Sequence, residues 1–440
     1  MKDRYDNTIT TNSQIARDLY VEGLDLFLAG QPGFLDVFEN AAAEDPGFAL
    51  GFVGLARGHQ FSGDLAKARD AMSRVGTLTK GLTTREQSHV NIFNLLIEGK
   101  VPAAYAAIRA HVLDHPRDAM VAQTCSSPLG LIGLSGLPGR EPEILAYTAS
   151  LAPHYGEDWW WLSQYAFALS ENGNQIKASE LIERSLALNP KNANGAHVQS
   201  HVYYESGEET LGLRFLDDWL SDYDSAGYLH GHLVWHSGLW SLEQGDIETM
   251  WRNFDTSIKP GASKGIPMLV LADAASLLYR TELAGFSVGQ ERWAEISAYA
   301  SRYFPTSTIG FADLHAAVSH AMAGNYDGVD RLVASPNPLT GDLVSPIAEG
   351  LAAISRGKWA KAVKHLSTAM ADHARLGGSR AQRDLLEYSL LSALLKLGMD
   401  DEARRLLALR RPALANTKSL HSLNTHQNMH TNLGAAALSA

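Results

Sequence analysis

The hydrophobic residues of this chain follow the spacing of α-helices along almost its whole length. Alanine-rich segments place apolar residues at positions i, i+3, i+4 and i+7, so that these residues share one helix face. Stretches in which β-branched residues alternate with polar residues, the pattern of a half-buried strand, are nearly absent. The pattern therefore predicts an all-α protein.

A second, longer pattern repeats along the chain. A glycine closes one helix, a small residue follows five positions later, a bulky apolar residue four after that, and often a proline eight further on. The clearest copy consists of Leu162, Ala166, Gly173, Ala178, Ile182 and Pro190. Other copies centre on Gly63, Gly99, Gly207, Gly245, Gly324, Gly357 and Gly398. This order, with a period of about 34 residues, is typical of tetratricopeptide repeats. It predicts a tetratricopeptide-like α-solenoid, a right-handed superhelix of helix pairs.

The spacing of these glycines favours one continuous array. It is 34 residues from Gly173 to Gly207 and 38 residues from Gly207 to Gly245. We therefore expect a single α-solenoid domain over residues 1–440, ending in a capping helix with a loose tail at about 413–440. Two stretches that contain proline and glycine, 126–158 and 256–267, interrupt the array and are predicted to form longer loops.

Composition excludes several classes of function. The formal net charge is -11 with acidic and basic residues interspersed, whereas binding to a nucleic-acid backbone needs clustered lysine and arginine. The single cysteine, Cys125, cannot form an intrachain disulfide. The polar start lacks a signal-peptide core, and no stretch of about 18 apolar residues occurs. We expect a cytoplasmic protein with no nucleic-acid or membrane partner. Since the chain also lacks a P-loop and a G-x-G-x-x-G fingerprint after a strand, no nucleotide cofactor is expected.

Two pairs of histidines are the most specific chemical feature of the sequence. His197 and His201, and then His232 and His236, lie four residues apart, so each pair shares one helix face. Counted from the glycine that closes each repeat, both pairs fall on or next to the inner stripe of the first helix. In tetratricopeptide repeats this stripe lines the concave, ligand-facing surface. We therefore expect the imidazoles to line one polar pocket.

Other polar residues are candidates to complete this pocket. Asp273 and Asp313 lie in helices that follow the histidine units, and either carboxylate could orient an imidazole. The candidate catalytic residues are His197, His201, His232, His236, Asp273 and His315. The candidate substrate-binding residues are Tyr204, Arg280, Asp313 and Arg383.

Four interpretations of the histidines stay open. The imidazoles could be structural, hydrogen-bonded to neighbours or stacked on Trp235 and Tyr203. They could bind a divalent metal such as zinc or iron, with Asp273, Asp313 or His315 completing the shell. One imidazole oriented by a carboxylate could be a general base without a metal. The groove could instead hold a protein tail. No glutamate lies inside either pair, so the H-E-x-x-H motif of zinc proteases is excluded.

The preferred function is small-molecule binding, with hydrolysis or a proton-transfer lyase or isomerase step as its chemistry. The alternative is a tetratricopeptide scaffold that binds proteins and has no catalytic activity. An enclosed pocket rich in histidine and aromatic residues favours the first function. An open groove displaying lysine, arginine and asparagine favours the second.

Two further polar segments are predicted to begin helices. In GGSRAQRD, Ser379 is the expected N-cap and Arg383 the expected member of an inter-helix ion pair; the alternative is that free N–H groups at this helix start bind an anion. Thr83 or Thr84 is expected to precede a helix that carries Glu86 in its first turn.

The chain from about residue 13 to 425 resembles the tetratricopeptide repeat protein 38 family. The matching stretches are LTTREQSHV at 82–90, AHVQSHVYY at 196–204, HLVWHSGLWSLEQGD at 232–246, DAASLLYR at 273–280, FADLHAAV at 311–318 and GGSRAQRD at 377–384. The resemblance implies the helical-repeat fold and brings no activity with it. The chain departs from the family at Ser126 and Ser127, where relatives tend to carry His-Asp, and at Tyr204, where a glutamate is usual and Glu205 is next door. These departures imply a rearranged site if those acidic groups are ligands or bases in relatives.

Overall fold

The fold is that of a computed structural model, which describes residues 1–410. α-Helices dominate these residues, and β-structure within them is confined to one isolated bridge between Lys2 and Thr8. The all-α prediction is confirmed. The capping helix and tail expected at 413–440 lie outside the described residues.

The contacts within the chain divide it into two compact units. The first comprises Met1–Gly133, Glu141–Gln199 and Tyr223–Leu229. The second comprises Leu134–Arg140, Ser200–Asp222 and the chain from His230 onward. The expected single domain over residues 1–440 stays a prediction.

The first unit contains eleven helices in chain order, with α8 included except for its first residue. They are α1 (Gln14–Ala29), α2 (Phe34–Glu44), α3 (Ala49–Phe61), α4 (Leu65–Val75), α5 (Thr84–Ile97), α6 (Val101–Asp114), α7 (Ala119–Ala122) with the 3-10 turn η1 (Gln123–Cys125), α8 (Arg140–Ser150), α9 (Ala152–Tyr155), α10 (Trp159–Glu171) and α11 (Gln175–Leu188). The division between the units falls inside α12 (Ala193–Ser206).

The second unit contains the remaining described helices. They are α13 (Glu209–Leu220), α14 (His230–Gln244), α15 (Ile247–Asn253) with the π-type turn η2 (Phe254–Ile258), α16 (Pro267–Leu283), α17 (Gln290–Tyr303), α18 (Gly310–Met322), α19 (Tyr326–Ala334), α20 (Gly341–Ser355), α21 (Trp359–Met370) with the 3-10 turn η3 (His373–Leu376), α22 (Arg380–Lys396) and α23 (Asp400–Arg410).

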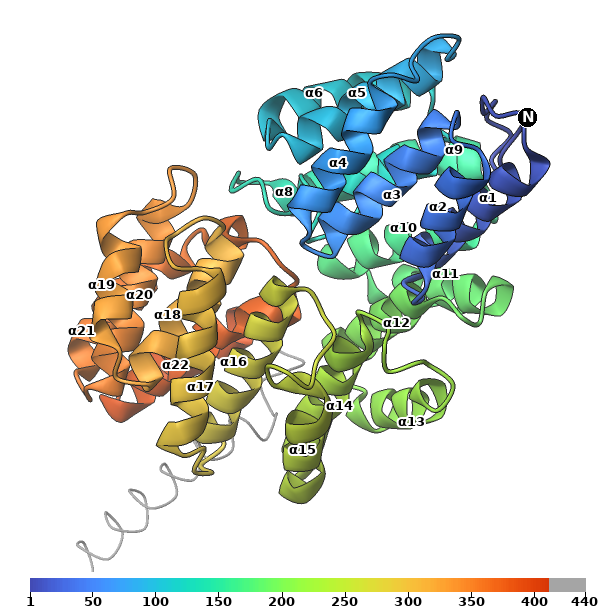
Figure 1. The fold of residues 1–440 in the computed structure, drawn as a ribbon. Coiled ribbons are helices and arrows are strands. Elements are labelled where there is room, and N and C mark those ends of the chain that lie inside the picture. The colour runs from blue at the N-terminus through green and yellow to red at the C-terminus, as the bar shows by residue number, and fades with distance from the viewer. Residues whose placement is uncertain (411–440) are drawn as a thin grey trace, which may run out of the picture. The chain divides into compact units, whose positions relative to one another are not determined.

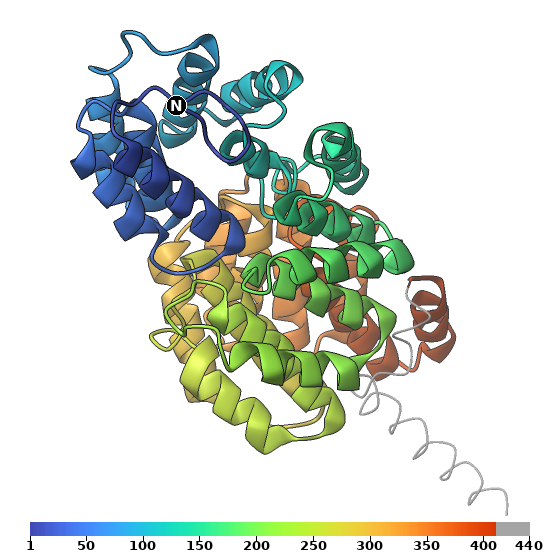
Figure 2. The ribbon, with the colours of Figure 1, turned by 90° about the vertical axis from the view of Figure 1, so that its right-hand side faces the viewer.

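Within each unit, successive helices form the predicted pairs. The pairs α3 with α4 and α5 with α6 in the first unit, and α20 with α21 in the second, are clear in Figure 1. Figure 2 shows the helices from a perpendicular direction. The glycines at the centres of the predicted repeats lie at the turns between helices, with φ from 64° at Gly357 to 85° at Gly173. Because only glycine adopts this left-handed conformation without strain, it ends the first helix and reverses the chain. The tetratricopeptide-like fold is confirmed.

The small residue that follows each turn lets neighbouring helices approach closely. Ala68, Ala104, Ala178 and Ala362 are all 0% exposed. At Gly212 a methyl group would not fit, because a Cβ there would lie 2.5 Å from the ring of Trp240. The repeat pattern therefore records helix packing as well as turns.

The two predicted loops have different outcomes. In the stretch 256–267, residues 259–266 connect η2 to α16 without a helix, as expected, whereas 256–258 belong to η2 and Pro267 begins α16. The stretch 126–158 was predicted to be a loop throughout, which is wrong, because it contains α8 and α9. Pro142 and Pro153 lie in the first turns of these helices, where proline has no intrahelical hydrogen bond to lose.

Several helices of the second unit are buried on nearly every face. Every residue of 231–242 in α14 and of 269–281 in α16 is buried. Helix α16 contacts α14, α17, α18 and α22 (Figure 1). Polar side chains on such helices are shielded from water and need partners inside the protein.

None of the helices in residues 1–410 is long and apolar enough to cross a membrane. The expected cytoplasmic location stays a prediction.

Candidate functional site

The two histidine pairs come together, as their spacing predicted. The ligand nitrogens of His197, His201, His232 and His236 all lie within 4.8 Å of one another. Helix α12 carries the first pair and α14 carries the second. His201, His232 and His236 are buried and His197 is half-buried. The assignment of these side chains as catalytic residues stays a prediction.

One carboxylate orients this histidine group. The Nδ1 atom of His232 lies 2.8 Å from Oδ1 of Asp273 on α16, and both side chains are buried. Burial raises the pKa of Asp273, and the neighbouring His232 opposes this shift. A carboxylate at Nδ1 favours the tautomer that carries its proton there, which leaves Nε2 as the basic nitrogen. Asp273 thus lies beside an imidazole, which is where the sequence analysis placed it as a candidate.

Aromatic and imidazole rings pack around the same group. Trp235 stacks on His232 with an interplanar angle of 13° and ring centroids 5.1 Å apart. Its indole Nε1 donates to Oγ of Ser276, at 3.0 Å, which fixes the stack. His236 meets His201 edge to face, with centroids 4.7 Å apart. The rings are therefore held in a packed environment that excludes bulk water.

Tyr204 and Arg280 form a second polar group in the second unit. The Tyr204 hydroxyl donates to Oδ2 of Asp384, at 2.8 Å, and Nη1 of Arg280 donates to the same hydroxyl, at 3.1 Å. The Arg280 guanidinium also donates to the carbonyl of Ala381, at 2.5 Å, and lies 5.0 Å from the ring centroid of Tyr388. The structure brings these predicted substrate-binding residues together and buries them, and their contact with a substrate stays a prediction.

Helix spacing relates this polar group to the histidines. His201 and Tyr204 are three residues apart on α12, and Asp273 and Arg280 are seven apart on α16, so each pair shares a helix face. Both helices therefore contribute first to the histidine group and then, further along the same face, to the Tyr204 and Arg280 group.

Ser379 is the N-cap of α22, as predicted. Its hydroxyl accepts from the Gln382 amide, and the Gln382 side chain accepts from the Ser379 amide. These contacts satisfy N–H groups that an anion would otherwise need. Arg383 is buried and donates to the carbonyls of Gly377 and Gly378. Its predicted roles in an ion pair and in substrate binding stay predictions.

Asp313 and His315 lie on α18 and do not belong to the group of four histidines. The Asp313 carboxylate accepts from the hydroxyl of Ser307, at 2.6 Å, and from the amide of Thr308, at 3.2 Å. Nδ1 of His315 lies 2.7 Å from the carbonyl of Phe311, and burial lowers the pKa of His315 to about 4. A neutral, buried His315 is suited to packing, and the catalytic role predicted for it stays a prediction.

Asp313→Asn is expected to remove a pH dependence of stability. Burial raises the pKa of Asp313 from 3.8 to about 6. Because the folded state favours the protonated carboxyl, Asp313 makes its full contribution to the free energy of unfolding below about pH 4. This contribution is lost as the pH rises through about 6. The wild type should therefore lose up to about 3 kcal/mol relative to the Asn variant over this window. Urea unfolding of both proteins at several pH values measures the difference, and a difference independent of pH would contradict the assignment.

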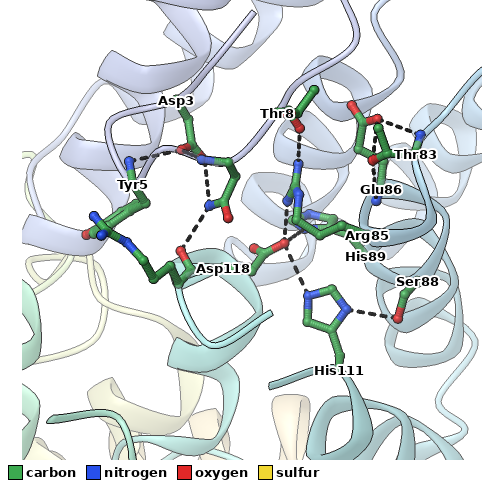
Figure 3. Close-up of polar contacts among 12 residues, drawn as sticks. Asp3, Tyr5, Thr8, Thr83, Arg85, Glu86, Ser88, His89, His111 and Asp118 are labelled. Atoms are coloured by element: carbon green, nitrogen blue, oxygen red, sulfur yellow. Dashed lines mark hydrogen bonds and ion pairs between the residues drawn. The ribbon is translucent and has the colours of Figure 1, made fainter. Parts of the chain in front are cut away.

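The first unit contains a buried polar cluster that the sequence did not reveal (Figure 3). Oδ2 of Asp118 lies 2.5 Å from Nη1 of Arg85, 2.9 Å from Nδ1 of His89 and 3.3 Å from Nε2 of His111. Burial disfavours the Asp118 carboxylate, yet the imidazoles and the guanidinium outweigh it and hold the pKa of Asp118 well below its ordinary value. The carboxylate is therefore an ionised centre that joins α5 to α6.

This cluster also fastens the N-terminal segment (Figure 3). Arg85 donates to the carbonyl of Thr8, at 2.9 Å. Glu86 accepts from the amide and hydroxyl of Thr10, at 2.6 and 2.7 Å, and completes a capping box with Thr83. The predicted helix start is confirmed, and the REQ segment has a structural role that explains its polar residues.

A groove of about 350 Å³ lies on the second unit between α13, α14 and α15. It is lined by Leu213, Asp217, Leu220, Val234, Ser237, Ser241, Gln244, Asp246, Thr249, Arg252 and Asn253. Most of these side chains are polar, and the apolar ones are Leu213, Leu220 and Val234.

Comparison with known proteins adds little about function. No family model matches the chain. The chain is similar to human IFIT1, solved as a dimer with m7Gppp-AAAA, at 13% identity over 95% of this chain and 96% of that chain, with a TM-score of 0.45. It is similar to yeast Tom70 at 14% identity over 94% and 96%, with a TM-score of 0.35. It is also similar to the P58(IPK) TPR domain at 14% identity over 88% and 99%, with a TM-score of 0.22. The assignment of the fold rests on the helix pairs and glycine turns above.

Proposed function

We propose that this protein is a tetratricopeptide-like scaffold that binds a partner protein. The succession of glycine-linked helix pairs in both units supports this proposal. Successive helix pairs stack on one another in such a fold and leave surface grooves between them. The histidine group, on which the small-molecule function depends, is a smaller part of the molecule.

The groove between α13, α14 and α15 is the proposed binding surface. Its volume of about 350 Å³ suits a short peptide segment. Asp217 and Asp246 outnumber Arg252 among its charged residues, which favours a segment that carries lysine or arginine. Leu213 and Val234 provide an apolar contact for a neighbouring side chain. The formal net charge of -11 also favours a positively charged partner and disfavours binding to nucleic acid.

A charge reversal in this groove tests the scaffold. Asp217→Lys should weaken capture of the partner by the full chain about tenfold, because it replaces attraction with repulsion at the groove. Asp218→Lys is a matched control, since Asp218 is also exposed and is not among the groove residues. Affinity purification with the wild type and both variants, followed by quantitative mass spectrometry, measures the effect. Equal recovery of every protein with all three chains would contradict the proposal.

A small-molecule site at the histidine group is the second candidate function. The contact between His232 and Asp273 favours it, since a carboxylate-oriented imidazole can accept a proton in a hydrolytic, lyase or isomerase step. The double variant His201→Ala with His232→Ala should then fold and lose a bound metabolite. A double variant that keeps every co-purified small molecule would rule out this candidate.

We also propose that the chain belongs to the tetratricopeptide repeat protein 38 family. The polar residues of its matching stretches support this membership, because a solenoid core alone does not require them. Arg85, Glu86 and His89 of the first stretch take part in the contacts around Asp118 and Thr10. Testing the same contacts in relatives would show whether these residues are retained for packing.

A further inference from the structure

We propose that His197, His201, His232 and His236 bind one divalent transition-metal ion, with Zn²⁺ as the fitting occupant. This inference goes beyond the scaffold function and does not depend on it. It rests on the positions of the imidazole nitrogens, since one nitrogen of each histidine lies within 4.8 Å of the others. The i,i+4 spacing puts each pair on one face of its helix, α12 or α14, and the fold brings these two faces together.

The spacing is close to what a tetrahedral shell requires. With Zn–N bonds of about 2.0–2.1 Å, neighbouring nitrogens of a tetrahedral site are about 3.3 Å apart. The widest pair of ligand atoms, at up to 4.8 Å, must therefore approach by about 1.5 Å. Binding of the ion therefore requires the imidazole rings to rotate about their side-chain bonds.

Asp273 supplies the support that metal-bound histidines usually have. Its carboxylate lies at Nδ1 of His232, so the metal-binding nitrogen of this ring is Nε2. Trp235, held by Ser276, covers the same ring. These contacts fix the orientation of His232 and leave Nε2 as the nitrogen that would bind the ion.

The donor set selects the class of metal. All the ligands are imidazole nitrogens, whereas Ca²⁺ and Mg²⁺ prefer carboxylate, carbonyl and water oxygens. Imidazole suits Zn²⁺, Cu²⁺, Ni²⁺ and Fe²⁺. Protein side chains would fill the whole tetrahedral shell, which is the arrangement of structural zinc sites, while catalytic sites keep one position for water. The ion would therefore join α12 to α14 rather than activate a substrate.

Metal titration of the full chain tests this proposal. The chain is stripped with a chelator, dialysed and titrated with Zn²⁺ alone, and in parallel with Co²⁺ as a spectroscopic probe. We expect one ion per chain, a visible Co²⁺ spectrum of the tetrahedral type, and a rise in Tm with Zn²⁺ concentration. The double variant His201→Gln with His236→Gln should bind less than a tenth of the metal under the same conditions.

His365→Gln is the matched control, because His365 belongs to the same unit and contacts Glu349 at 3.1 Å, outside the group. It should bind Zn²⁺ as the wild type does. If the double variant fails to fold, His197→Gln alone, at the half-buried edge of the group, should still weaken binding at least tenfold. A wild type without stoichiometric Zn²⁺ or Co²⁺ binding, or folded histidine variants that bind as tightly as the wild type, would overturn the proposal. Histidine variants that lose metal binding but recover the same partner protein as the wild type would leave the scaffold function intact.

Discussion

Asp118→Asn is expected to destabilise the first unit by about 3–5 kcal/mol. Asp118 is buried, and its Oδ2 atom contacts Arg85, His89 and His111. An amide of the same shape removes the negative charge and leaves the buried Arg85 guanidinium without its counter-ion. Urea unfolding followed by circular dichroism measures the change, and the N-terminal segment that Arg85 holds through Thr8 should become more accessible to proteases.

The matched control for this substitution is Glu180→Gln in the same unit. Glu180 contacts Lys177 at 2.7 Å, but both side chains are about half exposed. An exposed pair of this kind contributes at most about 1 kcal/mol, so this variant should unfold close to the wild type. If Asp118→Asn and Glu180→Gln shift the urea midpoint equally, the Asp118 cluster does not hold the first unit together.

The helix pairs could be predicted because their signals are local. A glycine with positive φ and a small residue five positions later describe a turn and the contact beside it, and both lie within one repeat. The pair α16 and α17 escaped the pattern. Its turn contains Gly285 with φ 91°, but α17 begins only at Gln290. In the other pairs fewer residues separate the glycine from the second helix. The longer link moves the buried residues Trp293 and Ile296 out of the expected register.

The same contrast between local and distant signals separates the two polar clusters. The histidine pairs could be predicted because four-residue spacing fixes them on helix faces, and their consecutive repeats are adjacent. Arg85 and His89 share one face of α5 through their four-residue spacing, but His111 comes from α6 and Asp118 from the residue before α7, and no local pattern links these segments. Only tertiary packing brings Arg85, His89, His111 and Asp118 together, so the sequence indicated one helix start and no cluster.

The sequence could not predict which of the two candidate carboxylates, Asp273 or Asp313, contacts a histidine of the group. Asp273 and Asp313 both follow the histidine units, and the sequence offered no way to rank them. In the structure Asp273 contacts His232, whereas Asp313 accepts from Ser307 and Thr308 just before its own helix. Aspartate near a helix start often takes such backbone and hydroxyl contacts, which compete with long-range partners. The choice between the two was made by packing of α16 against α14.

Asp273→Asn is expected to lower the affinity for Zn²⁺ by about 10–100-fold at unchanged stoichiometry. The variant keeps an oxygen that can accept from Nδ1 of His232, so the ring can stay in place while the loss of charge makes Nε2 a weaker ligand. Competition with a chelator of known affinity measures the change, and the Co²⁺ spectrum reports whether the shell keeps its geometry. Asp273 acts through His232 and is a positioning residue.

Asp255→Asn is the control for the carboxylate. Asp255 lies in the same unit and pairs with Lys259 and Arg292, at 3.3 and 3.0 Å, so its replacement also removes a paired negative charge. It should leave the Zn²⁺ affinity unchanged, because it contacts no histidine of the group in the described contacts. Equal affinities for Asp273→Asn and Asp255→Asn would show that the carboxylate at His232 serves packing alone. A weaker affinity for Asp273→Asn with an unchanged Co²⁺ spectrum would instead show that the charge at Nδ1 tunes the ligand, an effect that a purely structural contact does not produce.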